Sequence, residues 1–281
     1  MKKEIIKDVD YRNEDRPKTR LGQFGDIFKH RFGELIKLSL LQAIFNMPLI
    51  VSLILFYALI RSSGDINSLM TIFIIQGASF LISLPCAFIG MTGTFYCMKK
   101  LAYAEGEFAA SSFFIGLREE WKKGILIGLL AGISAAIAVI GFFFFYFYLS
   151  QFNTTITGLG IATTIIQFIV VLMVSYYALG QVVFYSNQMR FVYKNAFLLT
   201  LMRFPLNLLF FIIHPGIFII LSCIMEITMY VGIVIILFFS SFFHLMWVLN
   251  EVSAFDKYIN KENNPDFYRR GLANMEPNEE A

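Results

Sequence analysis

Two histidines are the residues of this sequence whose type and position could support chemistry within an apolar segment. His214 lies near the middle of one such segment, directly before Pro215, and His244 lies toward the end of the next. An ionisable side chain in a membrane is costly to bury and is by default a candidate for function. For His214 we favour a structural role, because a neutral imidazole can bond the backbone carbonyl that the Pro215 kink leaves without its helical partner.

No other motif completes a catalytic or metal centre around these histidines. The sequence has no phosphate-binding glycine loop, no zinc-binding histidine pair and no nucleophile elbow. The three cysteines, Cys86, Cys97 and Cys223, lie in or at the end of apolar stretches without metal-ligand spacing, as small hydrophobic side chains do. An intramembrane enzyme would need a catalytic pair that these residues do not supply. We therefore expect a protein that is not an enzyme, with no catalytic residue, metal or cofactor.

Uncharged polar residues and prolines are distributed over the apolar segments. The polar residues are Gln42, Asn46, Gln76, Gln167 and Asn207. In lipid such side chains more often hold helices together than bind a substrate. Pro48 and Pro85 are expected kink points, because proline removes one backbone donor and clashes with the preceding turn. We expect no acidic or basic residue deep in a spanning segment, which argues against a proton-coupled carrier.

An aromatic segment with charged edges, residues 106–124, separates two long apolar stretches. Its apolar side chains at helical spacing are Phe113, Phe114, Leu117 and Trp121. This spacing predicts one apolar stripe on a helix over residues 108–123, with Arg118 and Lys122 away from the stripe. A short amphipathic helix on the cytoplasmic membrane surface is the simplest interpretation. Two roles stay open for it: a structural elbow that leads into the next spanning helix, or a docking helix for a cytoplasmic or membrane partner.

A row of small residues follows this segment. Gly124, Gly128, Gly132 and Ala136 occur every four residues. Small side chains in this register allow two helix backbones to approach closely, because little side chain holds them apart. We favour a packing partner within the same chain, and a second copy of the chain is the alternative.

The composition and the lengths of the apolar segments predict an all-α, polytopic membrane protein. Hydrophobic residues make up 57% of the 281-residue chain and charged residues only 15%, whereas soluble domains carry about 25% charged residues. A spanning helix needs about 20 mostly apolar residues. About six segments meet this length: residues 35–60, 69–97, 124–149, 158–185, 205–223 and 227–249. The predicted organisation is a cytoplasmic tail (1–34), a transmembrane domain (35–249) with the surface helix between its second and third spans, and a second cytoplasmic tail (250–281).

The distribution of lysine and arginine predicts the orientation in the membrane. Of the 23 basic residues, 22 lie in residues 1–37, 98–123, 186–204 and 250–281, and Arg61 is the exception. Loops rich in basic residues stay on the cytoplasmic side of a membrane. Both ends of the chain and the surface helix are therefore expected in the cytoplasm.

The order and spacing of several short motifs carry a family resemblance. The motifs are residues 46–49 (NMPL), 85–92 (PCAFIGMT), 99–102 (KKLA), 113–114 (FF), 120–124 (EWKKG), 193–196 (YKNA) and 203–205 (RFP). Together they resemble the YesL-like family of bacterial integral membrane proteins, over about residues 22–259. That family is a domain of unknown function, so the resemblance implies a location but no reaction.

The resemblance implies a multi-pass protein of the bacterial cytoplasmic (inner) membrane. Genes of the family often accompany genes for polysaccharide breakdown and sugar import, which implies a non-enzymatic accessory or regulatory component linked to carbohydrate uptake. The expected partners are the lipid bilayer and sugar-import machinery, and no nucleic acid. Family members commonly have an aspartate before the aromatic pair, where this chain has Ser111 and Ser112, so a partner contact made by that aspartate would be altered here.

A transporter or channel for a small neutral solute is the alternative function. The proline-interrupted helices and the polar residues at mid-depth motivate it. The sequence does not indicate the oligomeric state.

Overall fold

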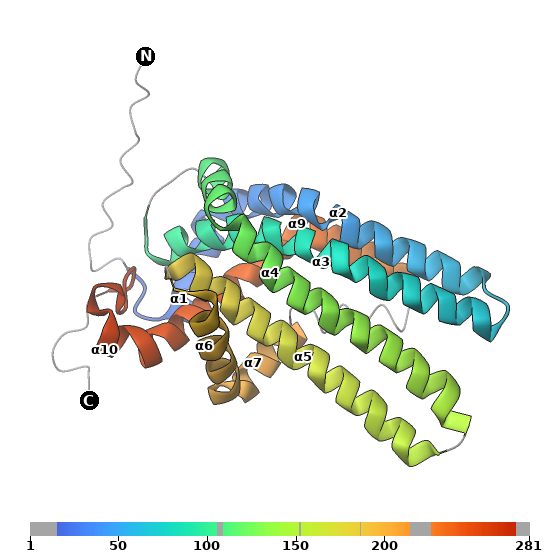
Figure 1. The fold of residues 1–281 in the computed structure, drawn as a ribbon. Helices are drawn as coiled ribbons and strands as arrows, with labels where there is room; N and C mark the ends of the chain where they lie inside the picture. The colour runs from blue at the N-terminus through green and yellow to red at the C-terminus, as the bar shows by residue number, and fades with distance from the viewer. Residues whose placement is uncertain (1–15, 106–108, 152, 186, 214–225, 274–281) are drawn as a thin grey trace.

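The computed structural model describes residues 16–105, 109–151, 153–185, 187–213 and 226–273. Within these ranges the chain is mostly helical and has no β-strand (Figure 1). The long helices are α2 (Phe32–Ser62), α3 (Ile66–Ala102), α4 (Ala109–Phe143), α5 (Thr154–Phe184) and α9 (Glu226–Phe255). The shorter helices are α1 (Arg20–His30), α6 (Met189–Met202), α7 (Phe204–Phe211) and α10 (Lys261–Asn263). The π-helical turns η2 (Phe144–Tyr148) and η5 (Asp256–Asn260) extend α4 and α9, and η3 (Leu149–Gln151) and η6 (Pro265–Phe267) are 3-10 turns.

Five helices are long and apolar enough to cross a bilayer. They comprise Phe32–Ser62, Ile66–Ala102, Ala110–Gln151, Thr154–Phe184 and Val231–Asn263. Each exceeds the about 20 residues that a bilayer core requires, so the chain is a multi-pass membrane protein. The all-α, polytopic fold predicted from the sequence is confirmed. These helices correspond to the first, second, third, fourth and sixth predicted spans.

The fifth predicted span, residues 205–223, begins in α7 and then leaves the described part of the chain. Proline lies in the first turn of α7, where its missing N–H would have no helical partner in any case. His214 and Pro215, the predicted polar and kink sites of this span, lie outside the described residues.

The predicted surface helix and the third predicted span form one helix. α4 runs without interruption from Ala109 to Phe143, and η2 continues it. The predicted boundary near residue 123 is therefore wrong. No proline interrupts this segment, and a continuous helix leaves no unpaired helix ends at the junction.

The long helices form a bundle with two distinct ends. The α2–α3 and α4–α5 turns lie at one end, and α1 and α10 lie at the other (Figure 1). At the first end Asp65 caps α3 by accepting from the Ser68 backbone N–H at 2.8 Å, and Asn153 caps α5 by accepting from Ile156 N–H at 3.0 Å. We call the second end the charged end, because two ion pairs lie there. Arg20 of α1 pairs with Asp256, and Glu105, shortly after α3, pairs with Arg270.

Parts of both predicted tails are folded onto the charged end. α1 falls within the predicted N-terminal tail, and its Phe28 ring lies 5.4 Å from the Phe242 ring of α9. α9 continues past the predicted end of its span to Phe255, and Leu272 farther along is buried. Gly271 has a φ of 84°, and a Cβ there would overlap the Ala102 carbonyl oxygen. Only glycine fits this left-handed position against the end of α3.

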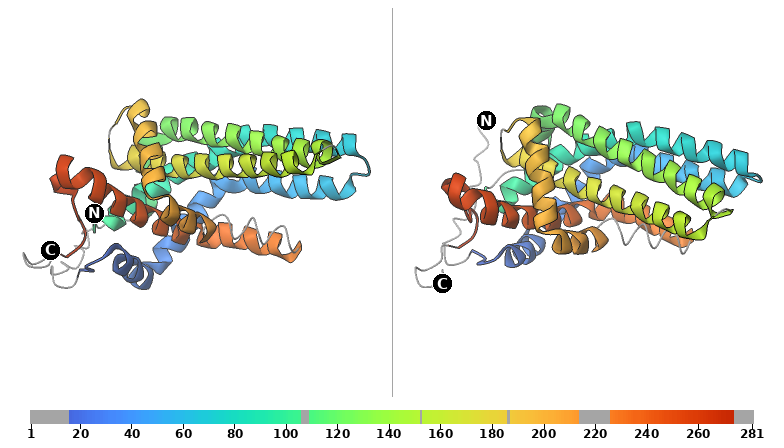
Figure 2. Two further views of the ribbon diagram at one scale, coloured as in Figure 1. Left: turned by 90° about the horizontal axis from the view of Figure 1, so that it is seen from below. Right: turned by 60° about the horizontal axis from the view of Figure 1, so that its bottom comes forward.

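The long helices pack side by side, with α3 between α2 and α4. α5 follows α4, and α9 packs against α1, α2 and α3. α6 runs across the long helices beside the charged end of α5 (Figure 2). This arrangement brings α5, α6, α7 and α9 together near the charged end.

Candidate functional site

The predicted apolar stripe at the start of α4 is divided between two environments. Phe113 is fully buried, and a Cβ added to Gly93 of α3 would lie 2.7 Å from the Phe113 carbonyl oxygen. Leu117 is half-buried. Phe114 and Trp121 are 56% and 43% exposed. Phe113 therefore packs on α3, whereas Phe114 and Trp121 project outward from the protein.

The outward face of the same turns carries basic side chains. Arg118 and Lys122 are exposed, and Lys122 Nζ lies 5.7 Å from the centre of the Trp121 ring. The neighbouring Lys123 pairs with Glu120 at 2.9 Å. Residues 109–123 therefore have an inner face that is fixed to α3 and an outer face with exposed cations and aromatic rings.

Glycines position α4 against α3. The residues of α4 that face α3 in one register are Gly124, Gly128, Gly132 and Ala136. A Cβ added to Gly128 would lie 2.6 Å from Pro85 Cα, and one added to Gly132 would lie 2.6 Å from the Phe80 carbonyl oxygen. Real Cβ atoms do not approach backbone this closely, so the two helices are in backbone contact only because these side chains are absent. The partner of the small residues is a helix of the same chain, as we favoured.

His244 belongs to a buried hydrogen-bond chain that joins three helices. The Gln42 amide Nε2 lies 2.8 Å from His244 Nε2, and the Thr94 hydroxyl donates to Gln42 Oε1 at 2.8 Å. An amide nitrogen can only donate, so His244 Nε2 accepts. The Phe95 and Tyr176 rings lie 5.9 and 6.0 Å from the imidazole. This geometry holds α2, α3 and α9 together.

Other polar residues of the spans also form interhelical bonds. Gln167 of α5 donates to Ser134 of α4 at 2.8 Å, and Gln76 of α3 approaches Ser52 of α2 at 3.5 Å. Asn46 is buried in α2. Both predicted kink prolines lie inside continuous helices: Pro48 is exposed in α2, and Pro85 is buried in α3.

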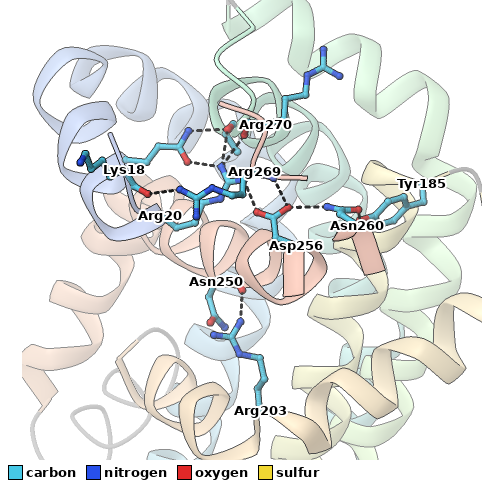
Figure 3. Close-up of polar contacts among 11 residues, drawn as sticks. Lys18, Arg20, Tyr185, Arg203, Asn250, Asp256, Asn260, Arg269 and Arg270 are labelled. Carbon is cyan, nitrogen blue, oxygen red and sulfur yellow. Dashed lines mark hydrogen bonds and ion pairs between the residues drawn. The ribbon is translucent and has the colours of Figure 1, made fainter. Parts of the chain in front are cut away.

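Asn207 of α7 connects three further segments. Its Oδ1 accepts from the Tyr177 hydroxyl of α5 at 2.8 Å and from Asn250 Nδ2 of α9 at 3.2 Å. Its Nδ2 donates to the Thr200 carbonyl oxygen at 3.1 Å. Arg203 donates to the Asn250 carbonyl oxygen at 2.9 Å (Figure 3). These bonds fix α5 and the α6–α7 junction to the charged end of α9.

Glu251 is the residue at this junction that the sequence did not indicate. Its side chain is completely buried in α9, and its Oε1 accepts from Trp247 Nε1 at 2.7 Å. A Cβ added to Gly180 of α5 would overlap its Oε2. The predicted end of the sixth span at residue 249 is therefore too early, because α9 carries a buried carboxyl group beyond it. Trp247, Glu251 and Phe255 are four residues apart and therefore share one helical face. This spacing, which continues past residue 249, could have indicated from the sequence that the helix extends to Glu251.

An ion pair closes the charged end around α9. Arg20 Nη2 lies 2.7 Å from Asp256 Oδ2, with side chains only 9% and 11% exposed. Asp256 Oδ1 accepts from Asn260 Nδ2 at 2.9 Å and from the Arg269 backbone N–H at 3.2 Å (Figure 3). Tyr185, at the end of α5, donates to Asn260 Oδ1 at 2.6 Å, and burial raises the pKa of its phenol. The cluster joins α1, α5, α9 and the residues after η5.

Metal and small-molecule chemistry has little geometric basis in the described residues. Among them, no group of three or more His, Cys, Asp or Glu could hold a metal ion. Two open grooves of about 550 and 380 Å³ flank α4 on the side away from the charged end. Apolar residues such as Leu81, Ile137 and Phe144 line the first, and Gln167 reaches the second. Their apolar walls fit acyl chains of the surrounding bilayer.

Comparison with protein-family models, with curated proteins and with solved structures finds no match. Two features of the described residues bear on function: the exposed outer face of α4 and the buried polar junction of α5, α7 and α9.

Proposed function

We propose that this chain is a non-enzymatic accessory or regulatory protein of the bacterial cytoplasmic membrane, and that it binds a component of sugar-import machinery. One observation carries the proposal: the first turns of α4 keep Phe114, Arg118, Trp121 and Lys122 exposed although the opposite face is already fixed to α3. Aromatic residues and arginine are enriched at protein interfaces, and Phe114, Trp121 and Arg118 supply them on this face. The link to sugar import comes from the family resemblance.

The basic side chains of this face define the kind of partner that it fits. Arg118 and Lys122 are not part of the ion pairs found among the described residues. Opposite charges across an interface steer association and select partners. The proposed partner therefore presents an acidic surface next to the membrane.

The same proposal places the charged end in the cytoplasm. Among the described residues, Lys and Arg are concentrated in the segments that meet at this end, and Arg61, near the opposite turn, is the exception. Retention of basic loops on the cytoplasmic side supports this orientation. Single cysteines at Thr154 and Glu262, in a chain without its native cysteines, test it. Thr154 should react with an impermeant reagent from outside and Glu262 only after permeabilisation, and the reverse pattern would refute the orientation.

Crosslinking in native membranes tests partner binding. The double variant Arg118→Glu, Lys122→Glu should insert and fold normally but lose the crosslinked sugar-import component. The matched control is Lys257→Glu, Lys261→Glu, which reverses two exposed charges after α9 at the same end of the molecule. A charge-reversed α4 face that keeps every partner captured by the wild type would refute the docking proposal, and the segment would be a structural elbow.

The second candidate, a transporter of a small neutral solute, gains one observation. A completely buried carboxyl group, Glu251, lies in the helix bundle together with the Gln42–His244 pair. Intramembrane polar groups often mark solute or proton paths. Solute flux by the purified protein in liposomes, without any other protein, would favour this function over the accessory role.

A further inference from the structure

The contact between α5 and α9 contains polar atoms that no partner satisfies. Glu251 is 0% exposed, and its Oε2 has no hydrogen-bond partner among the described residues. Gln181 of α5 is also 0% exposed, and neither its Oε1 nor its Nε2 has a partner. Most buried polar side-chain atoms in proteins are hydrogen-bonded, so each exception requires an explanation.

Gln181 follows Gly180, which lies against the Glu251 carboxyl group, and the ring contacts around it show that its face of α5 is turned toward α9. Tyr177 and Tyr185 lie one turn before and one turn after Gln181 on the same face of α5. Both tyrosine rings contact Phe255 of α9, at 6.4 and 5.5 Å, and Tyr177 also lies 6.2 Å from Trp247. Trp247 and Phe255 are one turn before and one turn after Glu251. The unsatisfied amide and the unsatisfied carboxyl oxygen therefore lie in the same layer of the α5–α9 contact.

Gly180 makes room for this carboxyl group. The overlap that a Cβ would cause with Oε2 shows that the carboxyl group lies directly against the α5 backbone. On its other side Oε1 is held by the Trp247 indole N–H. The carboxyl group is thus positioned from two sides, and only Oε2 is left without a bond.

The cations near this layer are engaged elsewhere. Lys99 of α3 donates to the Val183 carbonyl oxygen at 2.9 Å, and Arg203 donates to the Asn250 carbonyl oxygen at 2.9 Å. Arg20 of α1 pairs with Asp256. None of the ion pairs among the described residues includes Glu251.

The remaining titratable groups around the layer are hydrogen-bonded or aromatic. His244, two turns earlier on α9, is bonded to Gln42 of α2. Tyr176 of α5 packs on Trp247 with ring centres 5.0 Å apart, and the Tyr177 hydroxyl donates to Asn207 of α7. A buried carboxylate without a counter-ion is very costly, whereas the neutral acid is not.

We propose that Glu251 and Gln181 form a proton-binding site within the helix bundle, in which Glu251 carries the proton on Oε2. The exchange is Glu–COOH to Glu–COO⁻ plus H⁺, and the proton is taken up from and released to solvent at the charged end. Gln181 and Glu251 are not bonded to each other in the structure, but the Gln181 amide carries an oxygen acceptor for the acid and a nitrogen donor for the carboxylate, so it suits both protonation states. The inference does not depend on partner binding by α4.

A metal cation is a weaker occupant of this layer. Hard cations take about six or more oxygen ligands, whereas one carboxyl group and one amide supply three oxygen atoms here, and one of these already accepts from Trp247. A proton needs a single site, which Oε2 provides.

Trp247 is a built-in reporter for the protonation of Glu251. The chain has two tryptophans, Trp121 and Trp247, so in Trp121→Phe all tryptophan fluorescence comes from Trp247. Its fluorescence is followed in purified, bilayer-reconstituted protein between about pH 5 and pH 9, above the ordinary range of carboxyl groups and below that of tyrosine. We expect a single reversible step. A signal that stays constant over this range would refute an exchangeable proton at the site.

Two variants assign the step to the proposed residues. Glu251→Gln keeps an acceptor for the Trp247 indole and should abolish the step completely. Gln181→Leu should shift its midpoint, because it removes the group that can serve both protonation states. Infrared difference spectra provide a readout that does not use Trp247: the wild type should show a protonated-carboxyl band at neutral pH that Glu251→Gln lacks. A step or a band that survives in Glu251→Gln belongs to another group and overturns the proposal.

Repeating the titration in sodium, potassium and choline at constant ionic strength separates a proton from a metal cation. A midpoint that is the same in all three salts supports the proton site, and a midpoint that moves with the cation overturns it. The variant Arg118→Glu, Lys122→Glu should titrate like the wild type. Loss of the α4 partner and loss of the titration step are therefore separate outcomes.

Discussion

The α3–α4 contact and the α5–α9 contact both depend on glycine, but different groups occupy the space. Between α3 and α4, glycines such as Gly128 admit the backbone of the facing helix. Between α5 and α9, Gly180 admits the carboxyl group of Glu251. The first contact is between two backbones and contains no titratable side chain at these glycines. The second holds a titratable group in a layer with an unsatisfied amide, so close approach there serves chemistry as well as packing.

The largest effect is expected from a bulky residue in the α3–α4 contact. Gly128→Leu should destabilise the protein by about 3 kcal/mol or more, at the upper end of the overpacking range, because Pro85 Cα lies where the side chain must go. Loss of monodisperse protein and of the thermal transition in detergent is the measurement. Gly158→Leu is the matched control, since nothing lies within 4 Å of a Cβ at Gly158. Equal stability of the two variants would show that α3 and α4 are not in backbone contact.

A smaller and conditional effect is expected at the α5–α9 contact. Gly180→Ala should cost about 1–3 kcal/mol, because the added methyl group displaces the Glu251 carboxyl. In a Glu251→Ala background the same change should be neutral or stabilising, since alanine favours a helix over glycine by about 1 kcal/mol. Thermal unfolding of the four proteins of this cycle gives the coupling. If Gly180→Ala destabilised the wild type and the Glu251→Ala variant equally, Gly180 would contact the α9 backbone and not the Glu251 carboxyl group.

A still smaller effect is expected on the outer face of α4. Trp121→Glu should cost about 1 kcal/mol, because the indole is already half exposed. Arg118→Glu with Lys122→Glu should stay within about 0.5 kcal/mol of the wild type, as exposed charge changes usually do. Phe113→Glu is the reference that should fail to fold, since Phe113 is fully buried. A Trp121→Glu variant as unstable as Phe113→Glu would mean that the outer face also packs against protein.

The smallest effect concerns the cap that begins α3. Hydrogen bonds from the Ser68 backbone N–H and hydroxyl lower the pKa of Asp65. The folded pKa lies below the unfolded one, so this contribution to stability is present above the unfolded pKa and is lost as pH falls through the folded pKa. Thermal unfolding at acidic pH should therefore show a slightly larger loss for the wild type than for Asp65→Asn, which keeps an acceptor but does not titrate. An identical acid profile of both proteins would exclude this contribution.

The sequence alone determined the features that depend on local composition. Apolar stretches longer than a bilayer core must form helices there, because lipid leaves no other partner for backbone groups. The four-residue spacing of Gly124, Gly128 and Gly132 specified one close-packing face, since that period belongs to the helix itself. The polar residues Gln42 and Asn207 were predicted to join helices, and both do so.

Only the tertiary structure decided which residues meet across the chain. Arg20 and Asp256 are 236 positions apart, and α1 folds onto α9 because their buried surfaces fit, which no local pattern encodes. Charges after residue 249 suggested a solvated tail, yet α9 continues for almost two turns and carries Glu251 into the α5 contact. Burial is a property of what surrounds a side chain, so a carboxyl group near the end of an apolar segment looks the same in sequence whether water or Gly180 lies beside it.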